Sequence, residues 1–270
     1  MKLSISTLGC PGKDLDEVLA LLKTADVHGL EVRGIGGELN AEKITCFLPE
    51  NREETLAKLR ANNISLVCLD TSVSLHDASK YEKNVEECLA AIRLCREVGF
   101  PAIRVFGNDL SDGEGREEEL ATIKKLGLLL CDAARDAGVE VWLEIHGTIN
   151  TVENLAAVLD VLGPHPAFGI IWDIMHTDRA YGDKWDPVYR LIRPFIRHVH
   201  IKDHLRDSTP PFARVLLGHG HIPIDDIVHR LEKDGYRGYY SLEWEKLWNP
   251  QIEEPEIAFP QFAEYMKRFR

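Results

Sequence analysis

Apolar segments of strand-like composition alternate with segments of helical hydrophobic spacing along this whole 270-residue chain. The alternation recurs eight times, with a period of about 30 to 35 residues. We expect strands at residues 2–6, 30–33, 64–70, 102–106, 138–147, 168–173, 196–201 and 238–243, and helices at 14–29, 51–62, 79–98, 117–137, 150–162, 185–192, 224–234 and 256–269. Alternating strand–helix units imply a parallel sheet, and eight units in this length predict one closed (β/α)8 TIM barrel.

The barrel is expected to form a single domain over residues 1–270, because no linker or low-complexity segment interrupts the alternation. An open doubly wound sheet is the alternative α/β fold. That fold often carries a glycine-rich phosphate turn after its first strand, whereas the chain reads STLGCPGKD there, without G-x-G-x-x-G. The barrel is therefore favoured, with one long connection at residues 202–220.

Charge and composition narrow the classes of partner. The formal charge of −12 argues against a nucleic-acid partner or an anionic membrane surface. No apolar run approaches the ~20 residues of a membrane span, and the N-terminal MKLSISTLGCPGKD lacks the pattern of a signal peptide. The six cysteines contain no C-x-x-C pair, which indicates buried free thiols in a reducing compartment. A cytoplasmic protein without a membrane or nucleic-acid partner is expected.

The fifth expected strand, GVEVWLEIHG, carries acidic and basic side chains where an apolar core is expected. Because side chains alternate along a strand, Trp142, Glu144 and His146 share one face of it. A buried carboxylate is costly unless it is paired or bound to a metal ion. Glu144 is therefore either the partner of a neighbouring Arg or Lys or part of a functional site.

The ends of the last four strands show the same feature. Glu144 ends the fifth strand, Asp173 ends the sixth, His200 lies near the end of the seventh, and Glu243 ends the eighth. A parallel barrel carries its active site at the carboxyl ends of its strands, so these four side chains are expected at one rim. Three carboxylates and one imidazole suit one divalent ion, Mn²⁺ or Mg²⁺ first, with Co²⁺ or Zn²⁺ as alternatives.

The segments LEIHG, WDIMH, HVHIKDHLR and GYYSLEWE resemble those of the sugar isomerase and epimerase family with the xylose isomerase-like barrel. Ketose 3-epimerases, hydroxypyruvate isomerase and inosose dehydratase are members of that family. The resemblance implies one divalent metal ion, Mn²⁺ by preference, bound by Glu144, Asp173, His200 and Glu243. It also implies a small sugar or sugar derivative as substrate, and a homodimer or homotetramer.

The resemblance further implies that Glu144 and Glu243 transfer the proton next to the substrate carbonyl, through a metal-bound enediolate. His176 and Arg206 match family positions that contact substrate oxygens. His146 either contacts substrate or hydrogen-bonds a neighbouring ligand. A dehydratase of the inosose dehydratase kind is the alternative activity.

A DNA-repair barrel of the endonuclease IV kind is a more distant alternative. Its three zinc ions need histidines on the early strands and an Asp-x-His before a G-x-G turn, and FARVLL precedes Gly218 instead.

Several neighbours of the expected site have competing interpretations. Glu245 could replace Glu243 as the ligand, although Glu243 ends the apolar run. His198 is expected to be a hydrogen-bonded interior residue, and Asp203 is expected to orient His200. Lys202 and His204 are expected at the surface. Arg33 and Arg104, near the ends of the second and fourth strands, are expected to be ion-pair partners that could instead bind an anionic substrate group.

Overall fold

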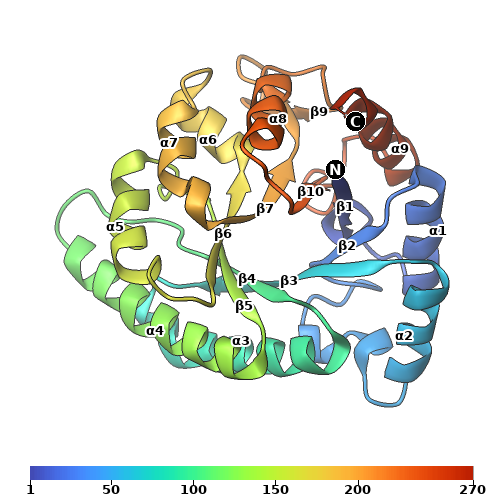
Figure 1. Cartoon of the computed structure of the whole chain (residues 1–270), viewed down its shortest axis with the longest axis horizontal. Helices are drawn as coiled ribbons and strands as arrows, with labels where there is room; N and C mark the ends of the chain where they lie inside the picture. The colour runs from blue at the N-terminus through green and yellow to red at the C-terminus, as the bar shows by residue number, and fades with distance from the viewer. Residues whose placement is uncertain (270) are drawn as a thin grey trace. The chain divides into compact units, whose positions relative to one another are not determined.

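The computed structural model describes residues 1–269, and its strands and helices follow the expected alternation closely (Figure 1). The elements are β1 (Lys2–Ser6), α1 (Leu15–Ala25), β2 (Gly29–Val32), α2 (Arg52–Ala61), β3 (Ser65–Ser74), α3 (Tyr81–Val98), β4 (Ala102–Phe106), α4 (Arg116–Ala137), β5 (Glu140–Glu144), α5 (Val152–Leu162), β6 (Phe168–Asp173), α6 (Ile174–Tyr181), α7 (Asp186–Ile192), β7 (Ile196–Ile201), β8 (Asp203–Leu205), β9 (Ala213–Val215), α8 (Ile224–Lys233), β10 (Tyr239–Leu242) and α9 (Pro255–Met266).

Hydrogen bonding orders the eight main strands β1-β10-β7-β6-β5-β4-β3-β2 into a closed parallel barrel, which confirms the predicted (β/α)8 architecture. By its internal contacts the chain divides into two compact units. The first unit comprises Met1–Val67 with His198–Arg270, and the second comprises Cys68–Arg197. The single-domain organisation of residues 1–270 stays a prediction.

In the second unit, β4, β5 and β6 pair in parallel and present apolar side chains to their covering helices. Val105 pairs in register with Leu143, and Leu143 with Ile170, and all three side chains are fully buried. The helices α3 and α4 pack side by side (Figure 1). Both end at a glycine with a left-handed backbone, Gly99 (φ 98°) and Gly138 (φ 73°), so that the chain can turn sharply into the next strand.

In the first unit, β1 lies between β10 and β2, and β10 pairs with β7. The side chains of these strands that face the interior in register are small or polar. Ser4 pairs with Ser241, and Ser241 pairs with His200. The helix α1 packs against α9 (Figure 1) and begins with a capping box between Asp14 and Glu17. Among residues 1–269, none of the helices has the length and apolar character that crossing a membrane requires.

Two elements differ from the sequence-based expectation. The helix α6 directly follows β6, because the carboxylate of Asp173 accepts hydrogen bonds from the backbone N–H groups of Met175 (2.8 Å) and His176 (3.3 Å) and so begins a helix. The long connection after β7 contains an antiparallel hairpin, β8–β9, with Asp203 paired to Val215. A strand of three residues has too few alternating positions to be recognised in the sequence.

The expectation of free, largely buried cysteines is confirmed. All six cysteines are free, and Cys46 is the one that is only half-buried. Burial raises the pKa of Cys46 to about 11 and that of Cys131 to about 12. Since the thiolate is the reactive form, both burial and the raised pKa slow the reaction of these groups.

We therefore expect a thiol reagent to modify one cysteine per native chain, slowly, and all six only after denaturation. Peptide mapping should locate the first modification at Cys46, and Cys46→Ser should remove it. Rapid modification of several thiols in the native protein would contradict this burial pattern.

Candidate active site

The second unit holds Glu144 at the end of β5 in a buried ion pair. Its side chain is 1 % exposed, and Nη1 of Arg104 lies 2.8 Å from its Oε2. Arg104 reaches it from β4, where Phe106 pairs in register with Glu144 and Arg104 lies two residues earlier. A second donor of the guanidinium, Nη2, bonds the carbonyl oxygen of Thr71 (3.1 Å). This pairing offsets the cost of burying the carboxylate and fixes one of its oxygens.

Asp173 is fully buried at the end of β6. One carboxylate oxygen, Oδ1, caps α6, and the other, Oδ2, lies 3.9 Å from Nε2 of His176. Asp173 therefore ends β6, caps α6 and places its second oxygen near the imidazole of His176. These contacts hold its side chain in one orientation.

His146 and His176 lie together in this unit, with ring centroids 4.2 Å apart, and His146 also packs against Phe106 (4.9 Å). Nδ1 of His146 lies 2.9 Å from Oδ1 of Asn108. Because an amide oxygen only accepts, Nδ1 carries the proton and Nε2 carries the lone pair in the neutral ring. His146 lies beyond the end of β5, rather than within the strand as expected. Substrate contact by His146 and His176 stays a prediction.

The first unit contains a buried network around Glu31, a residue that the sequence analysis did not assign to the site. Its Oε1 lies 2.7 Å from Nε2 of His200, and its Oε2 lies 2.9 Å from Nε2 of His198. The hydroxyl of Ser241 also donates to Oε2. All four side chains are fully buried. The signal was present in the sequence, since Leu30-Glu31-Val32 places a carboxylate inside an apolar strand in the same way as LEI does at Glu144.

Burial and the two histidines act on the pKa of Glu31 in opposite directions. Burial alone would raise the pKa of Glu31, but the charges and hydrogen bonds of His200 and His198 outweigh it and hold the pKa well below its usual value. The predicted role of His198 as a hydrogen-bonded interior residue is confirmed.

The prediction that Asp203 orients His200 is wrong. The carboxylate of Asp203 instead accepts hydrogen bonds from the backbone N–H groups of His204, Gly218, Gly220 and Ile222. Burial raises the pKa of Asp203, and these four bonds oppose that effect. Asp203 thus fixes the loop that precedes α8, while Glu31 holds the histidine.

Glu243 follows β10 and is buried beside His200, whose Nδ1 lies 3.4 Å from its Oε2. Nζ of Lys202 contacts the same Oε2 and lies 2.8 Å from Oε1 of Glu245. Lys202 is 1 % exposed and His204 is fully buried, so the prediction of a surface role for both is wrong. The position of Lys202 directly after β7 directs its side chain inward, where two carboxylates offset the cost of burying the ammonium.

Glu245 has a different set of partners. Arg214, on β9, binds its Oε2 through Nη2 (2.7 Å) and Nε (2.9 Å). Burial alone would raise the pKa of Glu245, but the charges of Lys202 and Arg214 outweigh burial and lower it. Glu245 therefore pairs with cations, and Glu243 is the one of the two glutamates that lies beside His200.

The two remaining arginines make local contacts. The side chain of Arg206 is half-buried in the loop between β8 and β9, and its backbone N–H donates to Nδ1 of His221 (3.1 Å). Arg33 is 9 % exposed, and its Nη1 bonds the carbonyl oxygen of Leu39 (3.2 Å). The expectation that Arg104 is an ion-pair partner is confirmed. A substrate contact by Arg206 stays a prediction.

A family model described as a xylose isomerase-like TIM barrel matches residues 16–268. The chain belongs to this family. A search of curated proteins found no match.

Solved structures of this xylose isomerase-like fold resemble the whole chain at low identity. They include a probable 3-DHS dehydratase, AsbF, from Bacillus anthracis (18 % identity, 99 % of each chain, TM-score 0.77). The IolI protein with a bound zinc atom aligns over 98 % of this chain and 97 % of its own (17 %, TM-score 0.79). The 3-keto-D-glucoside 4-epimerase YcjR from E. coli aligns over 100 % of both chains (17 %, TM-score 0.74). At these identities the likeness establishes the fold.

Two sets of side chains among residues 1–269 of this xylose isomerase-like barrel offer donors that could hold a metal ion. One set is Glu31, His198 and His200, and the other is Glu144, Asp173, His200 and Glu243. In the first set, hydrogen bonds already join Glu31 to both histidines. The second set, with three carboxylates and one imidazole, has the donor chemistry of a divalent-metal site.

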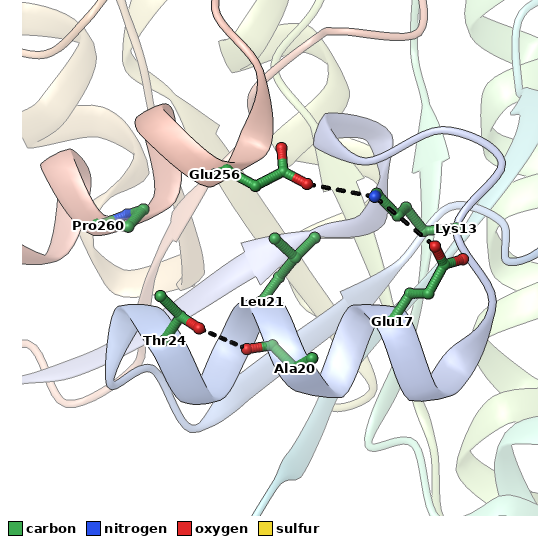
Figure 2. Close-up of a pocket in the computed structure, with 7 residues that line it drawn as sticks. All are labelled: Lys13, Glu17, Ala20, Leu21, Thr24, Glu256 and Pro260. Carbon is green, nitrogen blue, oxygen red and sulfur yellow. Dashed lines mark hydrogen bonds and ion pairs between the residues drawn. The ribbon is translucent and has the colours of Figure 1, made fainter.

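A surface hollow of about 220 Å³ lies between α1 and α9, and none of these side chains lines it (Figure 2). Figure 2 shows Lys13 between Glu17 and Glu256, and its Nζ lies 3.7 Å and 3.2 Å from their carboxylates. The charged groups of this hollow pair with one another, and the hydroxyl of Thr24 donates to the carbonyl oxygen of Ala20 (2.9 Å) within α1. The rest of its lining is aliphatic, so it offers no catalytic group.

We expect Lys202→Met to destabilise the metal-free protein by about 3–5 kcal/mol, because it removes the buried cation between Glu243 and Glu245. Urea denaturation measures the change. Lys58→Met is the matched control, since Lys58 forms exposed pairs with Asp16 and Glu54 and its loss should change stability little. Equal stability of the two variants would contradict the buried pairing of Lys202.

Proposed function

We propose that the protein is a divalent-metal-dependent isomerase or epimerase of a small sugar or sugar derivative. One observation carries the proposal: β5, β6, β7 and β10 each bring a buried carboxylate or imidazole to their carboxyl ends. These side chains are Glu144, Asp173, His200 and Glu243. In a parallel barrel the carboxyl ends of the strands surround the active site.

We infer that these four residues are the metal ligands. Within the first unit, Nδ1 of His200 and Oε2 of Glu243 are 3.4 Å apart. Two donors at ~2.1 Å from a shared ion have about this separation. Within the second unit, Glu144 and Asp173 supply two more buried carboxylates. Oxygen-rich ligation favours Mn²⁺ or Mg²⁺, and a barrel of the same fold, IolI, holds zinc.

The chemistry follows from the two glutamates. When bound, the ion would polarise the carbonyl oxygen of the substrate and stabilise negative charge that develops there. Glu144 removes the proton from the carbon next to the carbonyl and passes it to solvent, and Glu243, which takes up a proton from solvent, delivers it to the other face. Arg104 holds one oxygen of Glu144, and Lys202 contacts Glu243, so each carboxylate is oriented by its own cation.

A dehydratase is the second candidate, and the state of His146 favours it. Asn108 holds the proton on Nδ1 of His146, so the lone pair on Nε2 is available as a base. His146, two residues beyond Glu144, could remove the proton next to the carbonyl and return it to the β-hydroxyl group, which then leaves as water. The similar barrel AsbF is described as a probable dehydratase.

Further parts of the proposal rest on the family resemblance and on charge. His176 and Arg206 would contact substrate oxygens. The formal charge of −12 disfavours a nucleic-acid substrate. A cytoplasmic location and a homodimer or homotetramer stay predictions.

Glu144→Gln and Glu243→Gln should each lower turnover by at least about 10²-fold while leaving the circular dichroism spectrum unchanged, because each removes an acid–base group. The assay is a panel of ketoses, ketose phosphates and keto-inositols with Mn²⁺, in which solvent deuterium is followed into the product. Glu245→Gln is the matched control and should cost less activity, since Glu245 pairs with Arg214 and Lys202. Wild-type turnover in either of the first two variants would refute the two-glutamate mechanism.

Removal of the metal ion by a chelator should abolish turnover, and Mn²⁺ should restore it. Metal analysis should then find one ion per chain. Three zinc ions per chain would instead favour a repair endonuclease, and full activity in the presence of chelator would overturn the metal-dependent mechanism.

A further inference from the structure

We propose that Glu31 is a positioning residue that fixes the tautomer and ring orientation of His200, so that Nδ1 is the nitrogen that binds the metal ion. This inference rests on the proposed metal site, and it adds a residue on β2 to a site otherwise built from β5, β6, β7 and β10. All the contacts that carry it lie within the first unit.

The direct contact sets the tautomer. Nε2 of His200 lies 2.7 Å from Oε1 of Glu31, and the other oxygen of Glu31 meets two further donors, so both oxygens of this carboxylate act as hydrogen-bond acceptors. The proton of the neutral imidazole is therefore held on Nε2, and the lone pair is on Nδ1. That nitrogen is the one that lies 3.4 Å from Oε2 of Glu243. A carboxylate behind the imidazole in this way orients a ligating histidine and strengthens it as a donor.

Glu31 is itself held in place. Its second oxygen, Oε2, accepts hydrogen bonds from Nε2 of His198 (2.9 Å) and from Oγ of Ser241 (2.5 Å). His198 lies two residues before His200 on the same face of β7, and Ser241 pairs in register with His200. The carboxylate is thus fixed by both the strand that carries the ligand and its neighbour.

Small side chains on the intervening strands leave room for this contact. In the order β2-β1-β10-β7, the carboxylate of Glu31 reaches from the first strand to the fourth. Ser6 pairs in register with Glu31, and Ser4 pairs with Ser241, and all three serines are fully buried. Residues in register on parallel strands face the same side, so no bulky side chain stands between Glu31 and the two histidines.

The test measures the tautomer in the metal-free protein and the affinity for Mn²⁺ alone. Glu31→Gln keeps the shape of the side chain, but each histidine faces a different oxygen of Glu31, and the variant replaces one of these oxygens by an NH₂ group. The histidine that faces the NH₂ group would favour the other tautomer. Long-range ¹H–¹⁵N NMR spectra distinguish the two tautomers, and the His200 signals are assigned by their loss in His200→Asn. We expect the Nε2–H form in the wild type and a mixture in Glu31→Gln.

By calorimetry, Glu31→Gln should bind Mn²⁺ about 10- to 100-fold more weakly than the wild type. Leu22→Ala, in the buried face of α1, is a control for a general loss of stability and should bind Mn²⁺ as the wild type does. Ser241→Ala, which removes one hydrogen bond to Glu31 and keeps the carboxylate, should keep the tautomer and lose only a few-fold in affinity. If Glu31→Gln does not fold, Ser241→Ala still tests the role of Glu31.

The outcomes separate this inference from the function on which it rests. If the wild type binds Mn²⁺, and Asp173→Asn weakens binding while Glu31→Gln does not, the role of Glu31 is refuted and the metal site stands. If the wild type binds no ion, the proposed function fails, and the tautomer spectra alone decide whether Glu31 sets the state of His200. Two ions per chain would overturn the inference, because Glu31 would then be a ligand.

Discussion

A carboxylate buried inside a parallel barrel must obtain from the protein the charge and hydrogen bonds that it loses from water, and this cost governs the arrangement of the candidate site. Glu144 has Arg104 at 2.8 Å, and Glu31 has two imidazoles and a hydroxyl. Glu245 has Arg214 and Lys202. Each anion is therefore held in one orientation by a partner on another strand or on the β8–β9 hairpin.

Strand register determines which partners are available. Arg104 reaches Glu144 because β4 and β5 pair with Phe106 opposite Glu144, so the arginine lies diagonally across from the carboxylate. In the other unit, Ser241 pairs with His200, and the hydroxyl lies close enough to donate to Glu31. A change of one residue in either register would turn these side chains to the opposite face of the sheet. The hydrogen-bonded frame and the chemistry of the site are thus set by the same pairing.

The sequence was sufficient for the fold and for the buried residues at the strand ends, because both depend on local patterns. Alternating strands and helices predict a barrel, and the carboxylates after apolar runs mark Glu144, Asp173 and Glu243. The partners could not be predicted, since they depend on contacts between distant segments: Glu31 and His198 are 167 residues apart in the chain. The burial of Lys202 was not predicted for the same reason. The two carboxylates that stabilise its buried ammonium lie more than 40 residues further along the chain.

The contacts of Lys202 also explain why two glutamates follow β10. In the proposed metal site, Glu243 would hold an ion together with His200 while its carboxylate also contacts the ammonium of Lys202. Two cations at one carboxylate would repel each other unless further negative charge were close. Glu245 supplies it, since its Oε1 lies 2.8 Å from Nζ of Lys202 while Arg214 holds its other oxygen. Glu245 would therefore stabilise the lysine, which leaves Glu243 available as a ligand and as an acid–base group.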